Sequence, residues 1–217
     1  RSLGKGTITL IIRDPNITTI GDMNLALERV REGEAALFEC KSLLRVDLKG
    51  CTKLTSVGIA AFAACTSLMS VVLPDSLTQL GDVAFADTSL THVAFPDSLT
   101  QLGESAFDKC TSLTSVVFPD SLTQIGQQAF HDCTSLTSVV FPDSLTQLGK
   151  WAFGKCTSLT SVVFPDSLMQ LGEEAFYGCS SLTSVVLPDS LTQLGEGAFE
   201  HCSSLTSVVL PDSLTQL

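Results

Sequence analysis

Residues 113–135 read LTSVVFPDSLTQIGQQAFHDCTS, and residues 136–158 repeat nearly the same letters as LTSVVFPDSLTQLGKWAFGKCTS. The same unit recurs on both sides of this pair, with one proline in each copy. The prolines are Pro74, Pro96, Pro119, Pro142, Pro165, Pro188 and Pro211, separated once by 22 residues and five times by 23. A unit this short cannot bury its own apolar side chains and becomes stable only by stacking on copies of itself. The repeat therefore predicts a solenoid.

The first third of each unit predicts a strand. Leu113, Val116 and Phe118 carry the apolar pattern, and the last positions alternate inward and outward as in a strand. Pro119 cannot donate a ladder hydrogen bond, so it ends the strand. Stacked copies of this strand should form a parallel sheet along one side of the solenoid.

The rest of the unit should return the chain to the start of the next strand. Leu122 and Ile125 are expected to point back into the core, and Gly126 is interpreted as a turn residue that takes a positive φ. Residues 129–130, Ala-Phe, are expected to form a helical turn on the far side. Cys133 then closes the circuit as a small buried apolar residue.

The N-terminal segment departs from the repeat. A degraded copy is visible around Ile20 and Gly21, and Met23–Glu39 is a charged, Ala/Leu-rich stretch that predicts a helix. We expect residues 1–35 to be a cap holding the degraded repeat and this inserted helix. Residues 36–217 are expected to be the repeat array, which stops without a C-terminal cap.

The unit resembles the leucine-rich repeat family, most closely its 23-residue BspA-type class, through the pattern LxxVxF/L-P-x-S-L-x-x-L-G-x-x-A-F-x-x-C over about residues 36–217. The usual asparagine after the strand is replaced by Ser76, Ser98 and Ser121, which should make a weaker backbone ladder. The resemblance implies an α/β solenoid: a right-handed coil with a parallel β-sheet on one face and short helical turns or loops on the other. It also implies adhesion or protein binding at bacterial surfaces, without catalysis.

Charge and composition argue against several classes of partner and function. The net charge is −11 and the isoelectric point is near 4.5, so nucleic acid is an unfavourable partner. No apolar run reaches 18 residues, so no membrane span is expected. No motif for a metal or cofactor is present, and we expect none to be bound.

One acidic column is regular. Asp75, Asp97, Asp120, Asp143, Asp166, Asp189 and Asp212 each follow a proline. At a spacing of about 5 Å, neighbouring carboxylates would repel by roughly 0.8 kcal/mol in water. We expect backbone N–H groups of the turn to offset this repulsion. Calcium is the alternative, although one carboxylate in each turn suits it poorly.

The outward positions of the predicted strand are nearly uniform, which makes the concave strand face a candidate docking surface. The alternative is that serine, threonine and valine are present only because they stack well in a parallel ladder. A stripe of hydroxyls and methyls also allows binding to ice. The candidate residues on this face are His92, Ser115, Val117, Ser138, Val140, Ser161, Val163, Ser184 and Val186.

The copies differ mainly in the two dipeptides that flank Ala-Phe. Trp151 and Tyr177, the only tryptophan and tyrosine of the chain, occur there in adjacent copies, with Lys150 and Lys155 beside Trp151. Exposed aromatic and basic residues commonly anchor interfaces, so these four residues form a second candidate surface. Drift at solvated positions is the competing interpretation.

Cysteine and histidine do not predict an enzyme. Five of the eight cysteines share one column at 23-residue spacing, as buried apolar residues would. Residues 131–133, His-Asp-Cys, are adjacent in sequence, but the cysteine should face the core, so a catalytic pair is not expected.

The sequence therefore predicts a non-catalytic protein-binding or scaffold module, such as a fragment of a cell-surface adhesin, with protein partners of unknown identity. Two alternatives stay open: a rigid accessory structural subunit of a larger assembly, and an ice- or surface-binding solenoid. The family resemblance favours an extracellular or cell-surface location and leaves an organellar or cytoplasmic assembly open.

Overall fold

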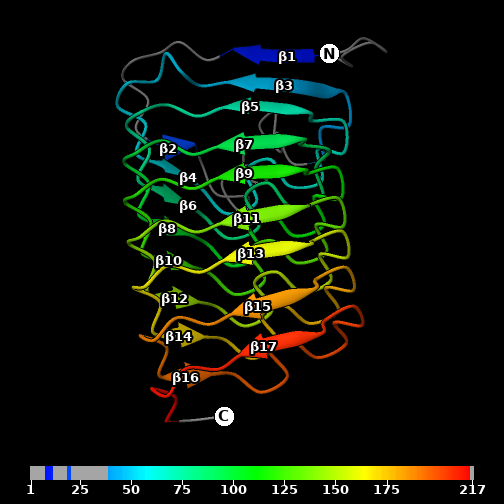
Figure 1. The fold of residues 1–217 in the computed structure, drawn as a ribbon. Helices are drawn as coiled ribbons and strands as arrows, with labels where there is room; N and C mark the ends of the chain where they lie inside the picture. The colour runs from blue at the N-terminus through cyan, green and yellow to red at the C-terminus, as the bar shows by residue number, and fades with distance from the viewer. Residues whose placement is uncertain (1–7, 12–18, 21–38, 216–217) are drawn as a thin grey trace.

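The computed structural model describes residues 8–11, 19–20 and 39–215, which form an elongated stack of coils (Figure 1). Each coil contributes one strand to a first column and a shorter strand to a second column. The first column contains β1 (Ile8–Ile11), β3 (Leu43–Asp47), β5 (Ser70–Val72), β7 (His92–Ala94), β9 (Ser115–Val117), β11 (Ser138–Val140), β13 (Ser161–Val163), β15 (Ser184–Val186) and β17 (Ser207–Val209). The second column contains β2 (Thr19–Ile20), β4 (Ser56–Val57), β6 (Gln79–Leu80), β8 (Gln101–Leu102), β10 (Gln124–Ile125), β12 (Gln147–Leu148), β14 (Gln170–Leu171) and β16 (Gln193–Leu194).

The first column is the strand side that the sequence predicts. Its strands run parallel, and equivalent residues of successive coils face each other, so that Ser115 pairs with His92 and Ser138 with Ser161. The ladder is made in short groups, β1-β3-β5, β7-β9, β11-β13 and β15-β17. The groups lie one above another in a single column (Figure 1).

The second column is an additional sheet that the sequence analysis did not predict. Its eight strands are hydrogen-bonded without interruption from β2 to β16, with Gln124 paired to both Gln101 and Gln147. The expectation of a sheet along one side only is therefore incomplete. Alternating exposure at Gln124 and Ile125, one outward and one in the core, is the ordinary pattern of a half-buried strand.

The expectation of helical turns is wrong, because the described residues contain no helix. The third side of each coil is a series of turns whose alternate N–H groups bond to the next coil, as Phe130 N does to Ala152 O at 2.8 Å. Gln128 and Asp132 have φ values of 54° and 59° in this segment. Two left-handed residues so close together prevent a right-handed helical turn, so the fold is a parallel β-solenoid rather than an α/β solenoid.

The predicted core is confirmed. Leu113, Val116, Phe118, Leu122 and Ile125 are all buried. Two files of phenylalanine rings run along the stack, one from Phe62 to Phe199 and one from Phe95 to Phe164, with stacked neighbours 5.1–5.9 Å apart. Each ring is thus covered by the rings of adjacent coils, which explains why one coil alone could not be stable.

The interpretation of Gly126 is wrong. Among the described glycines only Gly178 and Gly197 have positive φ values. A Cβ on Gly126 would instead lie 2.7 Å from Leu102 O and 2.9 Å from the carbonyl carbon of Gly103. Glycine is needed here because the backbones of adjacent coils approach too closely for any side chain.

The serine column forms a complete ladder. Ser121 Oγ donates to Leu99 O at 2.6 Å, and its counterparts from Ser76 to Ser213 each donate to a leucine carbonyl of the preceding coil. The cysteine column behaves similarly, with Cys133 Sγ donating to Phe107 O at 3.3 Å. In the copy that lacks cysteine, the buried Thr88 lies at this position, and its hydroxyl donates to Phe85 O of its own coil at 2.9 Å instead of to the preceding coil.

At the N-terminal end, β1 pairs with β3 and β2 pairs with β4, so Ile8–Ile11 and Thr19–Ile20 add one strand to each column. The helix expected over Met23–Glu39 lies outside the described residues, apart from Glu39. The division into a cap and an array at residue 35 remains a prediction.

Candidate binding surfaces

The strand face, defined here as the outward side of β7 to β17, carries a row of exposed valines. The side chains of Val117, Val140, Val163 and Val186 are 56%, 63%, 58% and 65% exposed. Because the partner strands are in register, these side chains form one file beside a file of exposed serines. His92 lies at the head of the serine file, where its Nδ1 is 2.8 Å from Ser115 Oγ.

A shallow pocket interrupts the valine file. Between β9 and β11 it has a volume of about 400 Å³ and is walled by Val117, Val140 and Phe141, with Asp120 and Asp143 on its rim. The expectation of backbone N–H donors for these carboxylates is wrong. Within residues 39–215, no hydrogen bond or ion pair is made by the exposed side chains of Asp97, Asp120, Asp143, Asp166 and Asp189.

The threonine hydroxyls at the edge of the strand face donate hydrogen bonds to the backbone of the preceding coil. Thr114 Oγ1 donates to Thr91 O at 2.9 Å, and Thr160 Oγ1 donates to Thr137 O at 3.0 Å. These hydroxyl protons are bound to the backbone and are not free to order water. Ice binding through the exposed serine and valine files stays a prediction.

The variable residues lie on the turn side and are brought together there. Trp151 and Tyr177 are in contact with ring centroids 4.7 Å apart, and they are half-buried rather than exposed as expected. His131 packs edge-on against Trp151 at 5.5 Å, and His201 packs edge-on against Tyr177 at 5.0 Å. Four aromatic rings thus form a row across adjacent coils, and the two histidines of this row were not among the sequence-predicted residues.

The two lysines of this surface do not act together. Lys150 Nζ makes an ion pair with Glu173 Oε1 at 2.6 Å, and this contact raises the pKa of Lys150. Lys155 has an exposed side chain, while its backbone N–H donates to Tyr177 O. Gly154 has no side chain to block the ring of Trp151, whose Cε3 would be 2.7 Å from a Cβ at that position.

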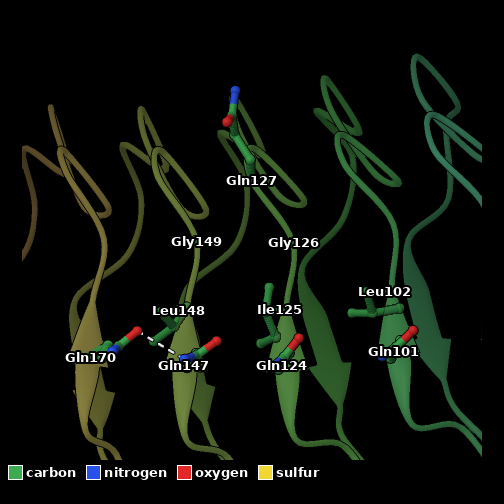
Figure 2. A pocket seen from close by; sticks show the side chains of 10 residues that line it. All are labelled: Gln101, Leu102, Gln124, Ile125, Gly126, Gln127, Gln147, Leu148, Gly149 and Gln170. Carbon is green, nitrogen blue, oxygen red and sulfur yellow. Dashed lines mark hydrogen bonds between the residues drawn. The ribbon is translucent and has the colours of Figure 1, made fainter.

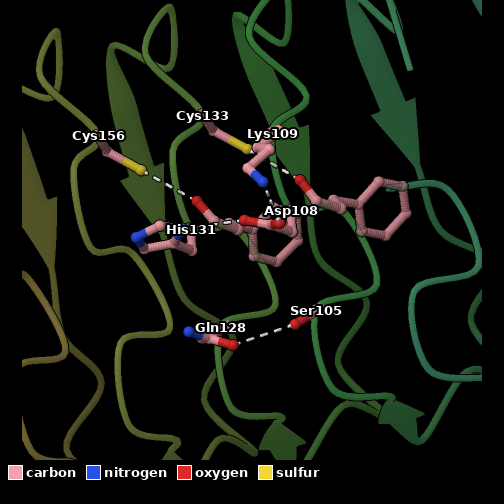
Figure 3. A network of polar contacts seen from close by, with 9 residues as sticks. Ser105, Asp108, Lys109, Gln128, His131, Cys133 and Cys156 are labelled. Carbon is pink, nitrogen blue, oxygen red and sulfur yellow. Dashed lines mark hydrogen bonds and ion pairs between the residues drawn. The ribbon is translucent and has the colours of Figure 1, made fainter. Parts of the chain in front are cut away.

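The histidine and cysteine of residues 131–133 point away from each other (Figure 3). His131 Nδ1 is 2.9 Å from Asp108 Oδ1, whereas Cys133 Sγ donates to Phe107 O inside the core. Burial raises the pKa of the Cys110 thiol to about 11 and that of Cys133 well above its usual range. These thiols are therefore neutral near pH 7 and are not placed to be activated by the histidine.

The second sheet carries a groove that the sequence analysis missed. Figure 2 shows its floor, a file of glutamine side chains on β8 to β14 beside the glycine file. Its volume is about 350 Å³, and Gln147 Nε2 donates to Gln170 Oε1 at 2.8 Å. The signal from which this strand could have been predicted is the glutamine followed by a leucine or isoleucine just before the glycine of each copy, as in Thr-Gln-Leu at residues 146–148.

In the part of the chain that the structure describes, no three histidine, cysteine, aspartate or glutamate residues are grouped to hold a metal ion. No helix there is long and apolar enough to cross a membrane.

Stacked coils of one short unit, with parallel strands, a leucine core and a serine ladder, define a leucine-rich repeat solenoid. The chain belongs to the family described as the BspA type leucine rich repeat region. The model of this family matches residues 31–160 and 123–217. A comparison with curated proteins finds no match.

Solved structures show the same fold in bacterial proteins. A leucine-rich repeat protein from Bacteroides ovatus has a TM-score of 0.67 at 23% identity, over 100% of this chain and 73% of that one. The leucine rich repeat protein of T. pallidum has a TM-score of 0.60 at 34% identity, over 77% of this chain and 75% of that one. A leucine rich cell surface protein from Faecalibacterium prausnitzii has a TM-score of 0.51 at 25% identity, over 97% of this chain and 68% of that one.

Proposed function

We propose that this chain is a non-catalytic protein-binding module that docks its partner on the strand face, in a cell-surface protein. Membership of a repeat family that generally binds proteins supports the first part. The similar cell surface protein from F. prausnitzii supports the location.

The exposed valine file carries the proposal. Fully burying a valine contributes about 1.5 kcal/mol or more, so covering four valines that are more than half exposed would contribute roughly 4 kcal/mol. The valines lie on a preformed sheet, so binding costs little ordering of this chain. The aromatic row offers a partner less apolar surface to bury, because its rings already cover one another.

Site-specific photocrosslinking tests the proposal. A photoreactive amino acid is placed at Ser161 on the strand face, at Lys155 on the turn side or at Gln124 on the second sheet, and each variant is produced in its native cells. We expect a discrete protein adduct from Ser161 only. The adduct should disappear when Val140→Lys and Val163→Lys are added, while circular dichroism stays unchanged. Adducts from Lys155 alone, or equally from all three sites, would contradict docking on the strand face.

A further inference from the structure

The strand face combines an apolar file with an acidic one. Where a pocket opens between β9 and β11, it is lined by members of both files, Val117 and Val140 with Asp120 and Asp143. The only basic residues between residue 54 and residue 217 are Lys109, Lys150 and Lys155, and all three lie on the turn side. Among residues 54–215 of the described chain, no lysine or arginine therefore lies beside the acidic file to neutralise it.

This combination restricts what can cover the valines. An anionic partner would place further negative charge against the aspartates. A second copy of this chain, laid face to face, would oppose two acidic files. A cationic partner with small apolar side chains matches both files, because it brings opposite charge to the rim and apolar surface to the valines.

The spacing of successive coils along the solenoid restricts the conformation of the partner. Strands that are hydrogen-bonded in a ladder lie about 4.8 Å apart, so at this spacing two coils span about 9.6 Å. One turn of a polyproline II helix is three residues and about 9.3 Å, which keeps every third residue aligned with every second coil. An α-helix advances about 5.4 Å per turn and loses register by about 2.4 Å over four coils. A β-strand repeats at about 6.7 Å and matches neither one coil nor two.

Building on the proposed function, the geometry points to a cationic polyproline II segment as the ligand of the strand face, with a basic residue at every third position. Its basic side chains contact alternate aspartates, such as Asp120 and Asp166, and its apolar residues cover the valines between them.

Synthetic peptides test this inference on the intact chain. The probe is the 12-residue peptide (Val-Pro-Lys)4, in which each valine before proline is held in extended or polyproline II backbone. The comparison peptides replace lysine by glutamate or by glutamine, or shuffle the same twelve residues so that the lysines are adjacent in pairs. Binding is measured by isothermal titration calorimetry at low and high salt.

Two matched double variants locate the site. Asp143→Asn with Asp166→Asn removes two carboxylates from the strand face, and Glu104→Gln with Glu196→Gln removes two from the turn side. Both pairs change the net charge by two. Because a lysine at every third position contacts only one of two neighbouring aspartates, we expect the first pair to weaken binding of (Val-Pro-Lys)4 by about 1.5- to 5-fold and the second to leave it unchanged. The difference should shrink in 1 M salt, where screening acts within about 3 Å.

Three results would overturn the inference: no binding of (Val-Pro-Lys)4 at millimolar concentration, equal binding of the shuffled peptide, or equal weakening by the two double variants. A protein adduct at Ser161 together with any of these results would leave the proposed function intact and refute only the cationic polyproline II ligand.

Discussion

Replacing Gly149 by alanine would put a methyl group where adjacent coils have room only for hydrogen. A Cβ at this position would lie 2.6 Å from Gln127 N and 2.7 Å from the carbonyl carbon of Gly126. Ordinary contacts begin near 3.4 Å, so the two coils would have to separate by about 0.8 Å. The bond from Gly149 N to Ile125 O, now 2.9 Å, would then lie beyond hydrogen-bonding distance.

The cost follows from these two effects. Overpacking against backbone costs about 1–3 kcal/mol, and a lost backbone hydrogen bond costs about 0.5–1.5 kcal/mol. Gly149→Ala should therefore lower the free energy of unfolding by about 2–4 kcal/mol. Gly178→Ala is the matched control, because a Cβ there is at least 3.7 Å from every neighbour and only the φ of 67° opposes it. We expect the control to cost about 1 kcal/mol.

Urea unfolding followed by the fluorescence of Trp151, the only tryptophan, measures the effect in the coil that carries Gly149. The midpoint should fall by about 1 M for Gly149→Ala and by much less for Gly178→Ala. Adding Gln127→Ala should not restore stability, because the collision is with backbone atoms. A cost for Gly149→Ala no greater than that of Gly178→Ala would refute the argument from coil spacing.

Three further predictions concern the same architecture. Val83 is a β-branched residue with a φ of 49°, so Val83→Gly should stabilise the chain by about 0.5–1 kcal/mol in the same urea assay, and a destabilised variant would contradict this. Ser144→Ala removes the donor to Leu122 O and should cost about 1 kcal/mol, whereas Ser138→Ala, on the exposed strand face, should change thermal stability by less than about 0.5 kcal/mol. Burial raises the pKa of the Cys65 and Cys110 thiols from about 9 to about 11, so the folded chain holds these protons more tightly than the unfolded chain. The contribution of these thiols to the free energy of unfolding is complete below about pH 9 and is lost as the pH rises through 11. Between these values the loss is about 1.4 kcal/mol for each thiol and each pH unit. Urea unfolding at pH 8, 9.5 and 10.5 would detect it.

The solenoid and its core could be predicted because they depend on a period that every copy repeats. Leu113, Val116 and Phe118 recur at 23-residue spacing, and only stacked coils can bury such a pattern. The turn side could not be predicted in the same way. Its conformation depends on left-handed residues at positions such as Gln128 and Trp151, whose side chains do not favour a positive φ. Contacts with the next coil hold them there, and those contacts exist only after stacking.

The features of the candidate surfaces also differ in whether the sequence could predict them. The exposure of the valine file was predictable because outward positions follow from inward ones, whereas its role in binding stays a prediction. The missing partners of the aspartates were not predictable, because a short turn commonly supplies N–H donors to such side chains and only coordinates show that it does not. The contact between Trp151 and Tyr177 also required the structure, because 26 residues separate them in sequence.

A periodic face has a further consequence for recognition. Each coil from β9 to β17 offers the same valine and the same aspartate, so this part of the strand face presents equivalent binding positions rather than one unique epitope. A ligand with a matching period can bind in several registers one coil apart, and each added period contributes a similar increment of free energy. The affinity of (Val-Pro-Lys)n should therefore rise with peptide length until the ligand spans the array, whereas a ligand of a single unique epitope would gain nothing from added periods.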